Sequence, residues 1–567
     1  MKLSDKYQHS RIWKTAAAAG LNALFLCCAL LFIAPHFEAN DDLTLAAFAD
    51  GQMAVKCGYI PYINFVLAQM LKGIYTVLGE SVTWHSVGQY ILLFLGFTGI
   101  SRILAEKLRF RQSSLISIIM LLFFGVDCYM IISYTKTAAV CAVGGMCLIY
   151  LASDNSDRTF RILPAVMGIL LCLFGFMLRK MEFLPCMAIT AVLCLRWLYK
   201  LLFAEKELTG REKLRRFLSF AAPFALMLVL CGGLLCADKL AWSRGRWGEY
   251  ASFDAVRVDY SDYGRPAYAL MAEEYDSLGL TESAVQLLEE GNYFDPDNFT
   301  KETMAAISAA RDARFPRPSV GECLGVLLDD CIPGFFVNLH VFAFLALLVL
   351  WLAAGEHDLC GMLTLAGAVG LFCLFYMYLI YRGRYLIDRV DVGLFLAMFA
   401  VLSMTIRSDR LDGEKLTAVI VLALSLYFSH WMERDMYRSA EYADLSRERA
   451  AVERILSDDE HIYLAKLDTV NDTLYPPFTP APAGYWDRII LLGGWDCNHP
   501  ALMDTLARYG VRNPYRDAVG NDKVYFIEDN IDLTLQYIHD YYDSDASAEL
   551  VEPLSRETGL SVYRILD

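Results

Sequence analysis

The chain has 567 residues, a formal net charge of −15, 56% hydrophobic residues and a mean hydropathy of +0.36. This composition excludes an ordinary soluble protein, and we expect a mainly α-helical, polytopic membrane protein. The acidic residues gather in two hydrophilic blocks: residues 237–334 hold 18 acidic and 9 basic side chains, and residues 432–567 hold 26 and 13. Such blocks would repel phosphates, which argues against nucleic acid as a partner.

The first apolar run, about Thr15–Ala34, is long enough to cross a bilayer core. No small-residue cleavage site follows it, so we interpret it as an uncleaved signal anchor. The positive-inside rule predicts a cytoplasmic N-terminus. The basic residues that precede the run are Lys2, Lys6, Arg11 and Lys14.

The first outer loop is expected at residues 35–84 and begins with the acidic pair Asp41 and Asp42. Within it, Pro61–Leu78 is apolar but contains Asn64, Gln69 and Lys72, which favours a helix lying at the membrane interface over a span. The second span is expected at Trp84–Leu104.

Nine further spans bring the predicted number to eleven. The basic residues of the short loops then fall mostly on the cytoplasmic side, and the odd number of spans places the C-terminus outside. The loop Gly355–Gly361 is an exception because it holds no basic residue. The nine spans are predicted at about residues 114–134, 138–152, 162–178, 183–201, 218–236, 336–354, 362–381, 392–406 and 416–431.

Four domains follow from this division. Residues 1–236 form an N-terminal module with spans 1–7, residues 237–335 a large extracytoplasmic loop with helices near Ala267–Asp276 and Thr300–Arg311, and residues 336–431 spans 8–11. Residues 432–567 are expected to open with a charged helix and to fold as a small α/β domain outside the membrane. Its predicted elements are helix Arg434–Ile455, strands His461–Leu467, Arg488–Leu492, Val524–Ile527 and Ser561–Ile565, and helices His499–Tyr509 and Ile531–Tyr541.

Several cations are exceptions to the charge bias, because the topology places them on the outer face with Asp41 and Asp42. A carboxylate there could take a proton from an acceptor hydroxyl while the cations hold a departing phosphate. This pattern is typical of transfer from a lipid-linked phosphate. The candidate phosphate-binding residues are Lys136, Arg179, Arg382 and Arg384.

Simpler interpretations remain open. Asp41 and Asp42 could cap a helix that begins at Leu43, and Asp42 is the better placed of the two to do so. Each cation could instead bind lipid headgroups. The scattered histidines and the cysteines show no metal-ligand spacing.

The N-terminal part of the chain resembles the GT-C superfamily of integral membrane glycosyltransferases. The features that carry the resemblance are the N-terminal anchor, the outer-loop acidic pair in Asn40-Asp41-Asp42 and the interfacial stretch Pro61–Leu78. The turn Phe176–Glu182 resembles the Arg-Pro-Glu turn of that superfamily but lacks its proline. The loop from Arg257 to Asp262-Tyr263-Gly264 and the turn Leu492–Trp495 are similar to those of a group of bacterial membrane proteins with no assigned activity.

The resemblance implies that Asp41 or Asp42 acts as the base, with a polyprenyl-phosphate sugar as donor and, in some members, a divalent cation. The hypothesis is therefore an inverting glycosyltransferase of the bacterial cytoplasmic membrane that acts on an extracytoplasmic cell-envelope acceptor. The alternative is a transporter or flippase for an anionic envelope precursor, which predicts polar residues at the centre of several spans. Neither the resemblance nor the residues indicate the oligomeric state.

Overall fold

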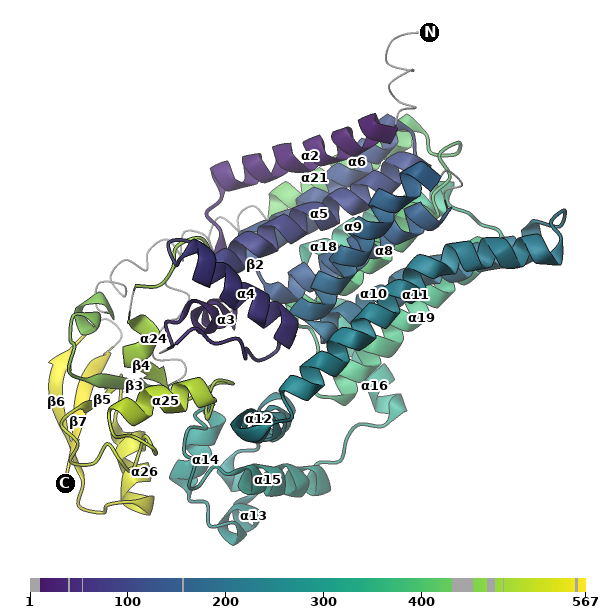
Figure 1. Cartoon of the computed structure of the whole chain (residues 1–567). Coiled ribbons are helices and arrows are strands. Elements are labelled where there is room, and N and C mark those ends of the chain that lie inside the picture. The colour runs from purple at the N-terminus through teal and green to yellow at the C-terminus, as the bar shows by residue number, and fades with distance from the viewer. Residues whose placement is uncertain are drawn as a thin grey trace.

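The computed structural model describes residues 11–38, 41–53, 55–154, 158–430, 452–466, 475–482, 484–555 and 559–567. An elongated helical bundle carries two smaller bodies at one end, the block of residues 237–335 and the C-terminal sheet (Figure 1). Most of the predicted charged helix Arg434–Ile455 lies outside the described residues.

A helix occupies each of the eleven predicted spans. Their bounds are α2 Arg11–Phe32, α5 Trp84–Lys107, α6 Phe110–Met120 continuing into α7 Val126–Met130, α8 Tyr134–Asp154, α9 Arg158–Leu178, α10 Lys180–Tyr199, α11 Gly210–Ala241, α18 Leu339–Ala354, α19 Leu359–Tyr381, α20 Asp388–Met404 and α21 Gly413–His430.

Fewer of these helices meet the length and composition of a span. Eight helices in the described part of the chain are long and apolar enough to cross a membrane, or nine when residues Val320–Phe335 and α18, bent by 96° to each other, are joined. Helix α20 has 17 residues and carries Asp388, Arg389 and Asp391 in its first turn, and the apolar part of α21 is only Leu416–Phe428. A mainly helical bundle with several helices fit to span a membrane is thus confirmed, whereas eleven spans and their orientation stay predictions.

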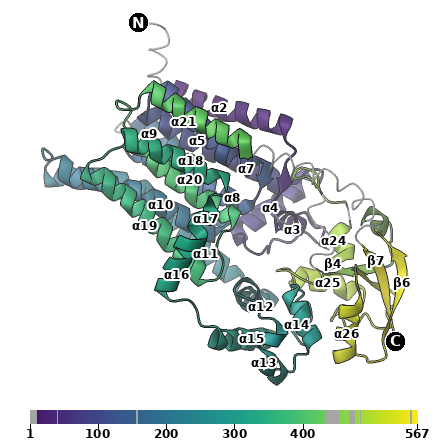
Figure 2. The same cartoon turned by 180° about the vertical axis from the view of Figure 1, so that it is seen from behind.

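Helix α8 is the centre of the bundle and is buried along nearly its whole length, between α5, α9, α10 and α20 (Figure 2). Glycines allow this close packing. A methyl group on Gly144 of α8 would lie 2.4 Å from the carbonyl oxygen of Gly96 of α5, and one on Gly145 would lie 2.8 Å from the carbonyl oxygen of Gly168 of α9.

Charged side chains join the helices at one end of the bundle, which we call the Lys14 end. Lys14 pairs with Glu106 at 3.2 Å. Glu356, from the loop between α18 and α19, binds both Arg196 and Lys200. The predicted loop Gly355–Gly361, which lacks basic residues, thus has its acidic Glu356 neutralised by cations at the end of α10 and directly after it.

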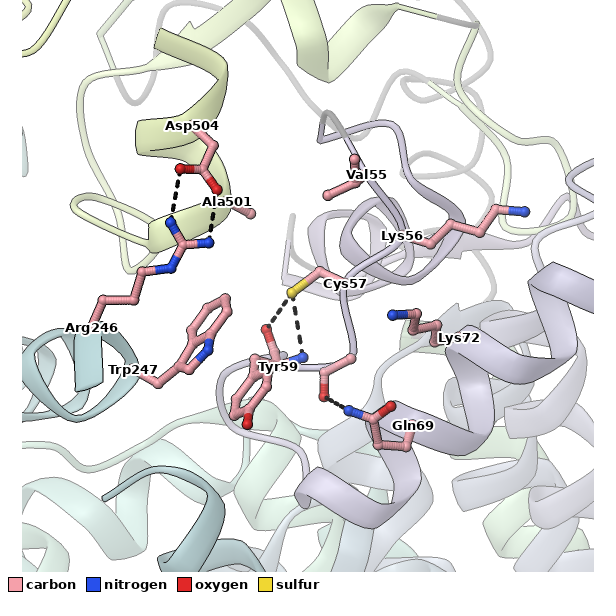
Figure 3. A pocket seen from close by; sticks show the side chains of 11 residues that line it. Val55, Lys56, Cys57, Tyr59, Gln69, Lys72, Arg246, Trp247, Ala501 and Asp504 are labelled. Atoms are coloured by element: carbon pink, nitrogen blue, oxygen red, sulfur yellow. Dashed lines mark hydrogen bonds and ion pairs between the residues drawn. The ribbon is translucent and has the colours of Figure 1, made fainter. Parts of the chain in front are cut away.

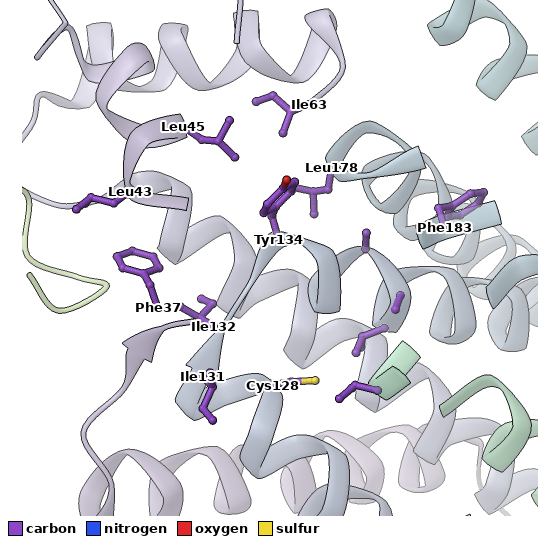
Figure 4. Close-up of a cluster of buried hydrophobic side chains, with 14 of the residues drawn as sticks. Phe37, Leu43, Leu45, Ile63, Cys128, Ile131, Ile132, Tyr134, Leu178 and Phe183 are labelled. Atoms are coloured by element: carbon purple, nitrogen blue, oxygen red, sulfur yellow. The ribbon is translucent and has the colours of Figure 1, made fainter. Parts of the chain in front are cut away.

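The opposite end, the Asp41 end, carries the first loop. Strand β1 (His36–Phe37) pairs in parallel with β2 (Ile131–Ile132), and the short helix α3 (Asp41–Asp50) follows. Helix α4 (Phe65–Leu78) is capped by the Asn64 side chain, which accepts from the Val66 N–H. Apolar side chains of the loop pack on the ends of α7, α8 and α9 (Figure 4). The buried residues labelled there are Phe37, Leu43, Leu45, Ile63, Cys128, Ile131, Ile132, Tyr134, Leu178 and Phe183.

The block of residues 237–335 is helical and lies beyond the Asp41 end (Figure 1). The predicted helices near Ala267–Asp276 and Thr300–Arg311 correspond to α13 (Ala272–Ser277) and α15 (Lys301–Arg314). The sequence did not predict the remaining α-helices of this block, which are α12 Gly245–Asp262, α14 Glu282–Glu289, α16 Val320–Val326 and α17 Ile332–Phe335.

The C-terminal block forms a five-stranded sheet in the order β4-β3-β5-β7-β6, with β4, β3 and β5 parallel. All four predicted strands are present, and β6 was missed because most of its side chains are exposed and it lacks a clean alternation. The elements are β3 Ile462–Ala465, α24 Tyr485–Arg488, β4 Ile489–Leu491, α25 Pro500–Arg508, β5 Val524–Glu528, α26 Asp532–Tyr541, β6 Ser547–Pro553 and β7 Ser561–Leu566.

The contact between Gly144 and Gly96 predicts that Gly144→Ala destabilises the bundle by about 1–3 kcal/mol, because the methyl group forces α5 and α8 apart. The midpoint of thermal unfolding in detergent should fall. Gly232→Ala in α11 is the control, since a methyl group there would meet no atom within 4 Å. Equal midpoints for the two variants would contradict the close helix packing.

Candidate functional site

Asp41 is the first residue of α3, and its carboxylate has partners from distant parts of the chain. The indole Nε1 of Trp495 donates to Oδ1 at 2.9 Å, and Nη1 of Arg389 lies 4.0 Å from Oδ2. The Asp41 side chain is 16% exposed, against 2% for Asp42. Of the two predicted acids, Asp41 is therefore the accessible one.

The Asp42 carboxylate is enclosed and fully bonded. It is 2.9 Å from Nε2 of His85, accepts from Nε2 of Gln89 at 2.7 Å, and accepts from the Tyr134 N–H at 3.2 Å. Burial raises the pKa of Asp42, and the bond to His85 opposes the rise. Asp42 thus caps the start of α8 rather than its own helix, and it fastens α3 to α5 and α8.

Arg179 lies in extended backbone between α9 and α10, on the side of Asp41. Its guanidinium donates to the hydroxyl of Tyr134 and lies over two rings, 4.9 Å from that of Tyr134 and 5.7 Å from that of Tyr62. Burial lowers the pKa of Arg179, and the Asp41 carboxylate opposes this. Among the described residues it forms no ion pair, so its charge is available to an anion.

Arg389, the second residue of α20, supplies a second cation at Asp41. The buried Glu182, in the first turn of α10, interacts electrostatically with both Arg179 and Arg389. Two arginines and two carboxylates therefore meet where α3, α10 and α20 begin. We call Asp41, Arg179, Glu182 and Arg389 the charged cluster.

Aromatic residues form the wall of this cluster. Tyr62 has a φ of +66°, a conformation that costs a non-glycine residue of order 1–3 kcal/mol and persists only where its surroundings fix it. The Tyr62 hydroxyl accepts from Nη2 of Arg257 at 2.8 Å, and its ring centroid is 5.4 Å from that of Trp495. Arg257 is itself held by Asp254. The surroundings of Tyr62 thus fix its ring beside Arg179 and Trp495.

Lys136 does not reach the charged cluster. Its ammonium is 1% exposed and lies 3.0 Å from Oδ2 of Asp127 and 3.2 Å from Oε2 of Glu38. It also donates to the Ile131 carbonyl. Two carboxylates satisfy this cation, which ties α7 and the β1 strand to α8.

Arg382 and Arg384 make their contacts with the block of residues 237–335 instead of with Asp41. The Arg382 guanidinium lies 3.6 Å from the centroid of the Tyr263 ring and 3.6 Å from Oδ1 of Asp259. Arg384 pairs with Asp262. The structure therefore brings only Arg179, of the four predicted phosphate-binding residues, to the acidic pair.

Trp495 reaches the site from the C-terminal sheet. It follows Gly494, whose φ of +88° suits glycine, in the turn after β4. The turn is fixed by a bridge between Gly493 and Asn292, and the Trp495 carbonyl accepts from the hydroxyl of Tyr250 at 2.5 Å. The sequence drew attention to this turn and to the cations after α19, but nothing local indicated that Trp495 and Arg389 would meet Asp41.

No group of three or more His, Cys, Asp or Glu side chains in the described residues is placed to hold a metal ion. No protein-family model matches the chain, and no curated protein or solved structure shows significant similarity to it. The candidate site therefore depends on its own geometry.

Substitution of the two aspartates should lower the free energy of unfolding by different amounts. Asp42→Ala leaves His85, Gln89 and the Tyr134 N–H without their buried partner, and we expect a loss of about 3–5 kcal/mol. Asp41→Ala removes a partly exposed ion pair and the acceptor of the Trp495 indole, and should cost less, about 1–2 kcal/mol. Thermal unfolding of both variants measures the difference. Equal losses would contradict the division between an anchoring and an accessible aspartate.

Proposed function

We propose that this protein is an inverting GT-C-type glycosyltransferase of the bacterial cytoplasmic membrane. It would move a sugar from a polyprenyl-phosphate donor to an extracytoplasmic cell-envelope acceptor. The observation that carries the proposal is the Asp41 carboxylate, accessible at one end of a membrane bundle and flanked by Arg389 and Arg179. The eleven spans, the cytoplasmic N-terminus and the outer C-terminal domain are part of this proposal.

In the proposed reaction, Asp41 takes the proton of the acceptor hydroxyl as its oxygen attacks the anomeric carbon. The bond from that carbon to the phosphate oxygen breaks, and its electron pair leaves with the polyprenyl phosphate. Arg179 and Arg389 are placed to stabilise the charge that grows on the phosphate. Arg179 is the stronger candidate, because no carboxylate of the described residues pairs with it.

A transporter is the less supported alternative. In the helices of the described bundle, charged side chains lie within about two turns of a helix end. Lys136 with its two carboxylate partners and the charged cluster lie at the Asp41 end, whereas Arg196 and Glu356 lie at the Lys14 end. A passage for an anion needs polar groups through the middle of the bundle, so this distribution favours a site at one surface.

Asp41→Asn should abolish transfer, with a rate at least about 100-fold lower, because the amide cannot accept the proton. Purified protein in nanodiscs would be incubated with a panel of polyprenyl-phosphate sugars and cell-envelope glycan, and the transferred sugar counted. Asp41→Asn removes no packing atoms, so an unchanged thermal midpoint serves as the folding control. Full activity of this variant would refute Asp41 as the base.

Variants of the different arginines should differ in kcat in the same assay. Arg179→Gln and Arg389→Gln should each lower kcat by about 10²–10³, as expected for loss of a donor that stabilises transition-state charge. Arg384→Gln is the matched control and should keep a kcat near that of the unmodified protein, since Arg384 pairs with Asp262. The opposite ranking would place the departing phosphate nearer the Arg382 and Arg384 loop.

A further inference from the structure

A separate cavity of about 220 Å³ lies where the first loop, α12 and α25 meet (Figure 3). It is smaller than the roughly 300–1,000 Å³ of sites for drug-sized ligands, so a single sugar or headgroup is the size of occupant to consider. The side chains that matter for its chemistry are Cys57, Tyr59, Lys72, Arg246, Trp247 and Asp504.

One wall of the cavity is aromatic and another is a planar ion pair. The rings of Tyr59 and Trp247 are stacked, 4.2 Å apart and 3° from parallel. Arg246 and Asp504 form a two-fold pair, with both N–H···O distances 2.8 Å. A stacked ring pair offers an apolar surface to the C–H groups of a sugar, and a guanidinium–carboxylate pair keeps free donors and acceptors for its hydroxyls.

Lys72 gives the cavity a net positive charge. Figure 3 shows its side chain pointing toward Cys57, and it has no carboxylate partner in the part of the chain that the structure describes. Lys56 points away and pairs with Glu80 at 2.7 Å. Since Arg246 is already neutralised by Asp504, Lys72 is the cation left to bind an anionic group.

We propose that this cavity binds a sugar residue that bears a carboxylate, such as a uronate. The sugar ring would lie against Tyr59 and Trp247, its hydroxyls would bond to Arg246 and Asp504, and its anionic group would meet Lys72. A phosphate alone would leave the aromatic wall unused. A neutral sugar would leave the Lys72 charge unpaired.

The position of the cavity suits a glycan at the membrane surface. Helix α4 exposes Met70, Ile74, Val77 and Leu78 on one side, as expected for a helix that lies on lipid. Lys72 is on a different side of α4, because each residue turns a helix by about 100°. The cavity therefore opens on the polar side of an interfacial helix.

Rings connect the cavity to the charged cluster. Trp247 is 5.4 Å from His499, His499 is 4.3 Å from Phe48, and Phe48 is 5.9 Å from Trp495, the donor to Asp41. The cavity thus lies several side chains from Asp41. As an acceptor subsite, which rests on the proposed function, it would hold a sugar other than the one that receives the new bond.

The test is binding of small probes to the full-length protein in nanodiscs, measured by titration calorimetry. Glucuronate should bind more tightly than glucose or inorganic phosphate. Lys72→Gln should weaken glucuronate binding about tenfold, which corresponds to about 1.4 kcal/mol, and should leave glucose binding unchanged. Lys56→Gln is the matched control, because Lys56 points away from the cavity, and should bind glucuronate as the unmodified protein does.

Three results would overturn the proposal: no glucuronate binding, equal binding of phosphate and glucuronate, or no effect of Lys72→Gln. The Asp41→Asn variant separates this inference from the proposed function, since it should still bind glucuronate. Glucuronate binding without any transfer would leave the cavity proposal standing and refute the transferase. Transfer without glucuronate binding would do the reverse.

Discussion

The first loop is held to the bundle by the buried Asp42 carboxylate. A carboxylate with 2% exposure is tolerated only when donors surround it, and here His85, Gln89 and the Tyr134 N–H supply them from α5 and α8. Successive residues of a helix point about 100° apart, so fixing Asp42 inward leaves Asp41 on a different, more exposed face of α3. The two aspartates therefore have different roles. Asp42 anchors the loop, and Asp41 is exposed at the end of the bundle.

Most cations of the Asp41 end are likewise stabilised by groups of opposite charge. Lys136 is buried deeply and has two carboxylate partners, while Arg382 and Arg384 bind the acids of α12. Arg179 differs because its direct contacts are two rings and a hydroxyl, while Asp41 and Glu182 act on it without forming an ion pair. A guanidinium keeps its charge under such desolvation because its ordinary pKa is so high. An anion entering beside Asp41 would find an arginine that forms no ion pair with the described residues.

Hydropathy predicted where the helices of the bundle lie, since long apolar runs have few alternatives in a membrane. Fewer of these helices meet the length and composition of a span, because polar residues or a bend intrude in α20 and before α18. In the candidate site, the acidic pair was predicted from its place directly after the first apolar run. Arg179 was predicted because it is a cation on the face where the positive-inside rule expects few. Trp495 could not be predicted, because its bond to Asp41 joins residues 454 positions apart and depends on the turn after β4. Arg389 could not be predicted either, because its position beside Asp41 depends on the packing of α20 against α10.

The C-terminal sheet completes the site through the edge at which parallel strands end, the place where open α/β sheets usually present ligand-binding groups. The turn after β4 delivers the Trp495 indole to one oxygen of Asp41, and Arg389 lies beside the other. An ionised carboxylate has about four lone-pair sites, so these two partners leave room for a further donor. A hydroxyl that bonds there would approach an oxygen whose orientation is already set by the indole, by α3 and by the buried Asp42. The sheet thus contributes orientation to Asp41, and the membrane bundle contributes the charge that surrounds it.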